Sequence, residues 1–249
     1  APADWPSRAV ESGAFPDRET YYDSLHEATT AAVRQQVRER ERADDQQLVH
    51  AVRSMDDARR TANELAERVT EWGQSRFGDD GSGIEYARRV ADRDPEDPTE
   101  AELVGLAETV VAMDDRADSL RATIEETTPA VAPNLAAMAG PVLAARLISL
   151  SGGLEPLAKS TSGTVQLLGA ESALFAHLQG NAPSPKHGVI YTHEYVRGTH
   201  PDERGSAARA LAGKLTIAAR VDHYSGERRP ELQAELDDRI ERIRSRREE

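Results

Sequence analysis

Residues 131–160 read VAPNLAAMAGPVLAARLISLSGGLEPLAKS, and their composition differs from that of the residues before them. This stretch is rich in Gly, Ala, Pro and Leu, poor in charge, and interrupted by Gly140-Pro141 and Gly152-Gly153. Such pairs end helices, because proline cannot donate the helical hydrogen bond and glycine loses more conformational entropy than other residues. The stretch therefore predicts several short apolar helices packed into a compact body.

Two longer segments upstream carry regular apolar spacing, at intervals of three and four with a single seven. The apolar residues are Leu48, Val52, Met55, Ala62, Leu65, Val69 and Trp72, then Leu103, Leu106, Val110, Met113, Ala117, Leu120 and Ile124. This narrow stripe is typical of coiled-coil helices. With the Gly-, Asp- and Pro-rich residues 78–98 between the segments, it predicts an antiparallel coiled-coil hairpin over residues 44–127. The alternative is two amphipathic helices packed on a globular body.

The other segments also read as helix. We expect an irregular lead-in and then a linker helix over residues 1–43. The compact domain is expected over residues 128–226, with a longer helix over 201–224. Residues 227–249 predict a charged C-terminal helix with a thin apolar stripe, formed by Leu232, Leu236, Ile240 and Ile243. No segment alternates as a strand does. The expected fold class is all-α: a long antiparallel coiled-coil hairpin plus a compact helical domain.

The chain is acidic and almost without lysine. Its formal net charge is −13, charged residues make up 30% of it, and three of its 31 basic residues are lysines. A carboxylate-rich, lysine-poor surface suits concentrated salt, because the Debye length is about 3 Å at about 1 M and self-repulsion largely vanishes. We therefore favour a halophilic protein over an ordinary acidic cytosolic one.

Positive charge is concentrated in one block of the chain. Residues 1–140 carry 30 acidic and 16 basic residues, whereas residues 141–226 carry 6 acidic and 8 basic ones. The lysines Lys159, Lys186 and Lys214 all lie in the second block. A locally positive segment of an acidic chain is the part suited to a phosphate backbone.

Other classes of site find little support in the sequence. Cysteine is absent, which excludes disulfides and thiolate metal sites, and no apolar run has the length of a membrane span. We expect a cytoplasmic protein that contacts no membrane and holds neither a metal nor a cofactor. HEYVRGTH at residues 193–200 raises the alternative of a metal-dependent hydrolase, but it lacks the histidine pair four residues apart that a zinc helix uses.

Three segments of the compact region resemble the Nop domain. They are residues 131–178, PKHGVIY at 185–191 and RGSAARALAGKLTIAARVD at 204–222. Upstream, QQLVHAVRSMDDARRTANELAERVTEW at 46–72 resembles the first arm of the same family's coiled coil. The family comprises the archaeal core protein of box C/D small ribonucleoproteins and its eukaryotic nucleolar and spliceosomal relatives.

This resemblance implies an RNA-binding scaffold without catalytic activity. In the family, the Nop domain binds the composite surface of a kink-turn RNA and its small, ribosomal-protein-like kink-turn-binding protein, while the coiled coil joins two copies. The scaffold positions fibrillarin, a 2′-O-methyltransferase, on the duplex of box C/D guide RNA and target. The expected role is therefore guide-directed methylation of ribosomal or transfer RNA. The alternative is a coiled-coil dimerisation protein that has lost RNA binding.

The sequence departs from the family's pattern in three places. The family's GAEKALFR stands here as GAESALFA, with Ser172 and Ala176 replacing a lysine and an arginine. Its RGKIAR stands as RGSAAR, with Ser206 replacing a lysine. The stretch that precedes the matched region is also far shorter than the family's N-terminal domain. We therefore expect the surface that docks fibrillarin to be missing, much reduced or trimmed from this chain.

The resemblance and the charge pattern together give the candidate residues. For RNA or partner binding they are Lys159, Gly169, Glu171, Lys186, His187, Arg204, Arg209, Lys214 and Arg220; for joining two copies they are Leu48, Val52, Met55, Leu65, Val69, Leu106, Met113 and Leu120. Counterion release contributes little in concentrated salt, so the remaining lysines are expected to make positioned contacts. One of the two arginines Arg209 and Arg220 is also expected to pair with Asp222.

Several of these residues have structural alternatives. Lys159 and Glu171 would then only cap helix ends, and His187 would be a structural loop histidine. Phe175 is expected in the core rather than on a stacking platform. The apolar seam of the hairpin can also be satisfied within one chain.

Overall fold

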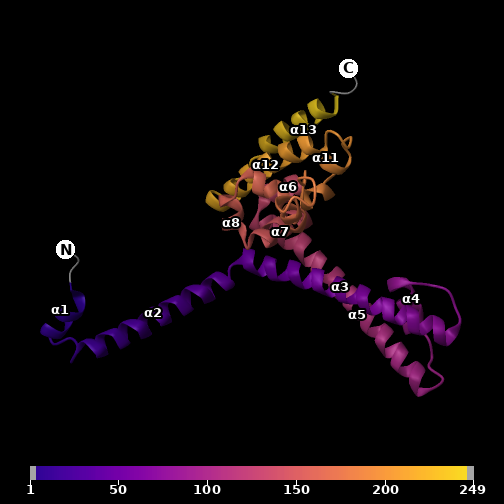
Figure 1. The fold of residues 1–249 in the computed structure, drawn as a ribbon, viewed down its shortest axis with the longest axis horizontal. Helices are drawn as coiled ribbons and strands as arrows, with labels where there is room; N and C mark the ends of the chain where they lie inside the picture. Colours follow the sequence, from indigo (N-terminus) through magenta and orange to yellow (C-terminus); the bar gives the residue numbers. More distant parts are fainter. Residues whose placement is uncertain (1–3, 246–249) are drawn as a thin grey trace. The chain divides into compact units, whose positions relative to one another are not determined.

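The computed structural model describes residues 4–245, which are helical almost throughout and contain no strand (Figure 1). The elements are α1 (Trp5–Glu11), α2 (Arg18–Glu41), α3 (Asp44–Phe77), α4 (Gly83–Ala91), α5 (Pro98–Val131), α6 (Pro133–Ala139), α7 (Pro141–Ser151), α8 (Leu154–Lys159), α9 (Ser162–Leu167), α10 (Glu171–Leu178), the 3-10 helix η1 (Val189–Thr192), α11 (Glu194–Arg197), α12 (Arg204–Tyr224) and α13 (Glu231–Arg244). The chain divides into two compact units, one ending at Gln47 and one beginning at Leu48. The expected all-α class is confirmed.

The first unit contains α1 and the long helix α2. An irregular lead-in is expected from the sequence, and this prediction is wrong for the residues of α1. That helix forms because the Asp4 carboxylate accepts a hydrogen bond from the Ser7 backbone N–H at 3.3 Å, and because Pro6 lies in the first turn, where no N–H donor is needed. Asp17 caps α2 in the same way, accepting from the Thr20 N–H at 2.8 Å.

The long helices α3 and α5 form the predicted hairpin, with α4 packed beside them (Figure 1). An ion pair of 2.5 Å between Arg59 and Asp118 joins the two long helices. Gly73 admits the ring of Tyr86, because a Cβ at this glycine would lie 2.7 Å from the ring's Cε1 atom. The apolar interior of this part consists of Ala66, Val69, Tyr86, Ala87, Val90, Leu103, Ala107 and Val110.

The base of the hairpin belongs to a second, larger apolar core. Leu48, Val52 and Met55 of α3 are buried in the same cluster as Ala117 and Ile124 of α5 and the short helices that follow. Each long helix therefore contributes to two cores in succession. The hairpin prediction and its alternative, amphipathic helices on a globular body, each describe one part of the helix pair.

The compact body is built around α12, which packs against α6, α8, α9, α11 and α13. Gly140 and Gly152, both with a positive φ, separate α6, α7 and α8 where the sequence predicts breaks. Alanines on α12 allow its neighbours to approach closely; its buried residues include Ala207, Ala208, Leu211, Ala212, Leu215, Ala218 and Ala219. Within residues 4–245 no single helix is long and apolar enough to cross a membrane. The sharply bent pair α6–α7 reaches the required length and apolar composition only when its two helices are taken together.

A buried polar junction fixes α6 to α12. The Asp222 carboxylate accepts hydrogen bonds from the backbone N–H groups of Asn134 (3.0 Å) and Leu135 (2.9 Å) and from the Asn134 side-chain amide (2.6 Å). It thereby satisfies the first N–H groups of α6, which have no partner inside their own helix. The Asn134 side-chain oxygen Oδ1 accepts in turn from the Arg229 backbone N–H at 2.7 Å. This junction ties three distant parts of the chain together.

Candidate nucleic-acid interface

The segment that carries Lys186 is held to the body through its backbone. The Gly188 N–H donates to the Gln166 carbonyl oxygen (2.8 Å), and the Gln166 side-chain amide donates back to the Lys186 carbonyl oxygen (2.7 Å). Only glycine fits at 188, because a Cβ there would lie 2.8 Å from the carbonyl carbon and oxygen of Leu167. The side chain of Lys186 is exposed, and the hydrogen bonds to Gln166 together with the close packing at Gly188 fix the position of the segment that carries it.

Three of the predicted residues, Lys186, His187 and Arg204, lie together in what we term the Lys186 cluster. The His187 ring stacks on Tyr191 with centroids 4.6 Å apart and an interplanar angle of 22°. The guanidinium carbon of Arg204 lies 5.4 Å from the centroid of the same tyrosine. Burial, followed by the nearby charges of Arg204 and Lys186, lowers the pKa of His187. The histidine is therefore neutral at pH 7 and fixed by its stack, with Lys186 as the charged, exposed member of the cluster.

Helix α10 presents apolar side chains on the surface. Phe175 is 63% exposed and Leu178 is 74% exposed, so the prediction that Phe175 lies in the core is wrong. Their spacing resembles a core face, but α10 buries none of its residues. At its start, a Glu171 carboxylate oxygen accepts from the Gly169 N–H at 2.8 Å, and Gly169 adopts a φ of 80°. These two residues shape the turn into α10, and Phe175 is left free to contact a partner.

The three lysines have different surroundings. Lys159 pairs with Glu155 one turn earlier at 2.6 Å, which raises the pKa of the lysine. Lys214 of α12 pairs with Glu235 of α13. Within the part of the chain that the structure describes, Lys186 has no carboxylate partner. It is thus the lysine whose charge remains available to a ligand.

Arg220 is occupied by backbone oxygens rather than by a carboxylate. Its guanidinium donates to the carbonyl oxygens of Ala158 (3.1 Å) and Ser160 (3.2 Å), which lie at the end of α8. The predicted pair between Asp222 and either Arg209 or Arg220 is wrong, because that carboxylate caps α6. Arg209 is exposed on α12 instead.

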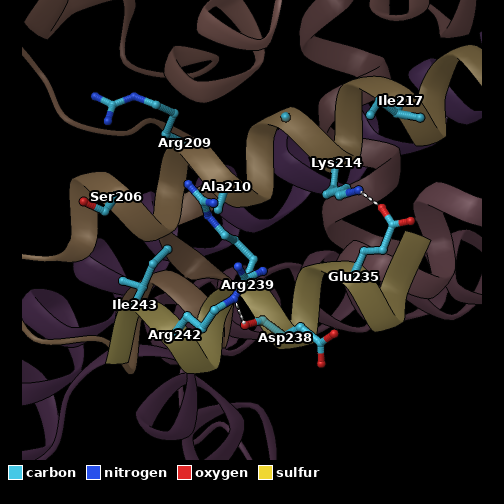
Figure 2. A pocket seen from close by; sticks show the side chains of 11 residues that line it. Ser206, Arg209, Ala210, Lys214, Ile217, Glu235, Asp238, Arg239, Arg242 and Ile243 are labelled. Carbon is cyan, nitrogen blue, oxygen red and sulfur yellow. Dashed lines mark hydrogen bonds and ion pairs between the residues drawn. The ribbon is translucent and has the colours of Figure 1, made fainter. Parts of the chain in front are cut away.

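Arg209 and Lys214 line a groove between α12 and α13 (Figure 2). Arg239 and Arg242 of α13 line the same groove, and the sequence reasoning missed both. Their spacing of three residues, beside the apolar stripe of the C-terminal helix, was the available signal.

The eight residues predicted to join two copies fall into two groups. Leu48, Val52, Met55 and Val69 are buried within one chain, whereas Leu65, Leu106 and Leu120 are half-buried and Met113 is 37% exposed. A contact between two hairpins would therefore draw on the second group.

His193, from the alternative metal motif, has its ring bonded to the protein. Its Nδ1 accepts from the Tyr195 N–H (3.1 Å), so its Nε2 carries the proton and donates to the Met138 carbonyl oxygen (3.0 Å). Among residues 4–245, no three His, Asp or Glu side chains are grouped so that they could hold a metal ion. The ring connects α6 to the segment before α11.

We expect His193 to make folding sensitive to acid. Burial lowers its pKa below the ordinary 6.5, so the unfolded chain binds this proton more readily than the folded one. Its contribution is complete above pH 6.5 and is lost as the pH falls below that value. Denaturant unfolding at about pH 7.5 and about pH 5.5 should show a smaller loss of stability in His193→Gln than in the unchanged protein. Equal losses in the two proteins would contradict this role.

Comparison with known proteins agrees with this architecture. Residues 46–244 match the family Nop, described as "snoRNA binding domain, fibrillarin". An uncharacterised NOP5 family protein of Methanocaldococcus jannaschii is 31% identical over 271 residues, covering 94% of this chain and 66% of that protein. Nucleolar protein 56 of Saccharomyces cerevisiae is 35% identical over 148 residues, covering 59% of this chain and 28% of that protein.

A solved structure shares the fold. In the crystal structure of a fibrillarin/Nop5p complex, one chain matches with a TM-score of 0.60 and 25% identity, over 98% of this chain and 88% of that one. The curated relatives are longer, since this chain spans 66% and 28% of the two named above. The family match nevertheless covers both the hairpin and the body, and the chain belongs to the Nop family.

Proposed function

We propose that this protein is an RNA-binding scaffold of a box C/D ribonucleoprotein and not an enzyme. It would recognise a kink-turn RNA together with the small kink-turn-binding protein. The observation that carries this proposal is the exposed Lys186, which has no carboxylate partner within residues 4–245 and lies on a hydrogen-bonded segment inside the region that matches the snoRNA-binding family. Phe175 and Leu178 on α10 add an exposed apolar surface suited to a base or to a partner protein.

The concentrated-salt environment that the composition predicts would explain why so few lysines suffice. Affinity that rests on counterion release falls steeply as salt rises. Contacts with defined geometry and a shared protein surface lose less, because they do not depend on long-range attraction. Lys186 fits this requirement, since Gln166 donates to its backbone oxygen and accepts from the nearby Gly188 N–H.

The scaffold role also includes partners. The sequence leads us to expect a missing or much reduced fibrillarin-docking surface, but the matching chain comes from the crystal structure of a fibrillarin/Nop5p complex and 88% of it is covered. This match supports the role, and we propose that the present chain helps to position fibrillarin for guide-directed 2′-O-methylation. We further propose that residues 44–127 act as the dimerisation arm and residues 128–226 as the RNA-binding domain. Met113, with its exposed thioether side chain, would lie in the seam between two copies.

The proposal predicts that Lys186→Gln weakens assembly about tenfold, the equivalent of about 1.4 kcal/mol for one positioned ionic contact. Binding is measured on a box C/D kink-turn RNA with and without its small binding protein, in about 2 M potassium chloride. Arg68→Gln serves as the control, because it removes one exposed positive charge from α3.

Two outcomes would count against the proposal. If the folded protein binds no kink-turn RNA even with the small binding protein, the coiled-coil dimerisation alternative is favoured. If it binds but Lys186→Gln and Arg68→Gln behave alike, the Lys186 cluster is not the contact.

A further inference from the structure

The groove between α12 and α13 is open and lined from both helices (Figure 2). Its volume is about 620 Å³. Its lining residues are Ser206, Arg209, Ala210, Gly213, Lys214 and Ile217 of α12, with Glu235, Asp238, Arg239, Arg242 and Ile243 of α13.

The groove is positive in a strongly negative protein. Its lining holds four cations and two carboxylates, a net charge of +2, while the chain as a whole carries −13. Glu235 is neutralised by Lys214, and this ion pair joins the two helices across the groove. This ion pair holds α13 against α12, so Lys214 is not counted among the groups available to a ligand.

Three arginines in the groove have no carboxylate partner within residues 4–245: Arg209, Arg239 and Arg242. The Arg242 Nε donates to the Asp238 backbone oxygen at 3.0 Å, which leaves the terminal nitrogens of its guanidinium available. Arg239 and Arg242 lie three residues apart, about 4.5 Å along the axis of α13. They face the groove from the opposite side to α12 (Figure 2). Guanidinium groups in such a row suit successive phosphates, each of which accepts two parallel N–H bonds.

The lining of the groove contains no aromatic side chain, and on the α12 side it includes the small residues Ser206, Ala210 and Gly213. At Gly213 a Cβ would meet nothing within 4 Å, so the helix surface there is open to a ligand. Single-stranded nucleic acid bases bind by stacking on aromatic rings, which this groove does not provide. Its chemistry therefore favours a sugar–phosphate backbone over bases, and a continuous strand over a small enclosed ligand.

We propose that the α12–α13 groove binds a stretch of RNA backbone, with Arg209, Arg239 and Arg242 as its phosphate ligands. This proposal rests on the proposed function and adds to it a contact made by residues other than Lys186 and those of α10. It assigns to the C-terminal helix a binding role that does not depend on RNA sequence. Contacts of this kind fix the register of a nucleic acid without reading its bases.

The test places a carboxylate in the groove and leaves the three arginines unchanged. Gly213→Glu is expected to weaken assembly on the RNA, together with the small binding protein, about tenfold, whereas Gly213→Gln changes it less than about threefold. Gly105→Glu on α5 is the matched control, because a Cβ there also meets nothing within 4 Å. Circular dichroism and size-exclusion chromatography of each variant establish that fold and assembly state are kept.

A second measurement identifies the phosphates. In the double variant Arg239→Gln with Arg242→Gln, the slope of log affinity against log salt should fall by about 1 to 2, as expected for the loss of one or two phosphate contacts. If the unchanged protein binds RNA but Gly213→Glu matches Gly105→Glu and the slope is unchanged, the groove proposal is wrong while the scaffold stands. If the unchanged protein binds no RNA, the scaffold itself fails.

Discussion

Replacing Asp222 with alanine is expected to lower the free energy of unfolding by about 3 to 6 kcal/mol. The change leaves two backbone N–H groups at the start of α6 and one N–H of the Asn134 side-chain amide without an acceptor, at about 1 to 2 kcal/mol each. The other N–H of that amide keeps its bond to the Glu227 carbonyl oxygen. The site is closed to water, since Asn134 is fully buried and Asp222 is 8% exposed. Chemical denaturation followed by circular dichroism in concentrated potassium chloride measures the loss.

Two further variants show whether the hydrogen bonds cause this loss. Asp222→Asn should be intermediate, because its amide keeps one oxygen but turns an NH₂ group toward the donors. Asp118→Ala removes an exposed carboxylate that pairs with Arg59, and it should change stability by less than about 1 kcal/mol. A loss below about 1 kcal/mol in Asp222→Ala would show that the junction contributes little.

Gly188→Ala is expected to impair RNA binding by at least about tenfold although Lys186 remains in place. The added methyl group would collide with the Leu167 carbonyl. Because this neighbour is backbone rather than a flexible side chain, the segment 186–189 must move. The overpacking should also cost about 1 to 3 kcal/mol of stability. Both effects are measured, by RNA binding and by thermal unfolding.

A double variant separates displacement from unfolding. If Gly188→Ala already displaces Lys186, adding Lys186→Gln should weaken binding much less than it does in the unchanged protein. Gly163→Ala in α9 is the control, since its nearest neighbour lies 3.7 Å away and alanine favours helix. Full additivity of the two substitutions would mean that Gly188 does not position the lysine.

The fold was accessible from the sequence because its signals are local. Apolar spacing of three and four residues predicts α3 and α5, and Gly140 and Gly152 mark the ends of α6 and α7. The same local rules missed α1, whose helix depends on a single cap by Asp4. Short helices without an apolar stripe leave little trace in periodicity.

The candidate site was accessible only in part, because it depends on contacts between distant residues. Asn134 and Asp222 are 88 positions apart, and no local pattern indicates that this carboxylate caps α6 instead of pairing with an arginine. Phe175 has the spacing of a core residue, yet its exposure depends on which elements cover α10. Arg239 and Arg242 gain their significance from the packing of α13 on α12. Sequence identifies the chemistry available, whereas tertiary packing decides which groups remain free.

Because α3 and α5 each run without a break through two apolar cores, the hairpin sets the distance between its tip and the body. No flexible joint separates the residues buried in the body from those buried beside α4. One residue inserted into each arm would move the tip by about 1.5 Å and turn it by about 100°. A seven-residue insertion in each would restore its direction to within about 20° while lengthening the arm by about 10 Å. The lengths of the two helices therefore set both the distance and the rotation of the tip relative to the body.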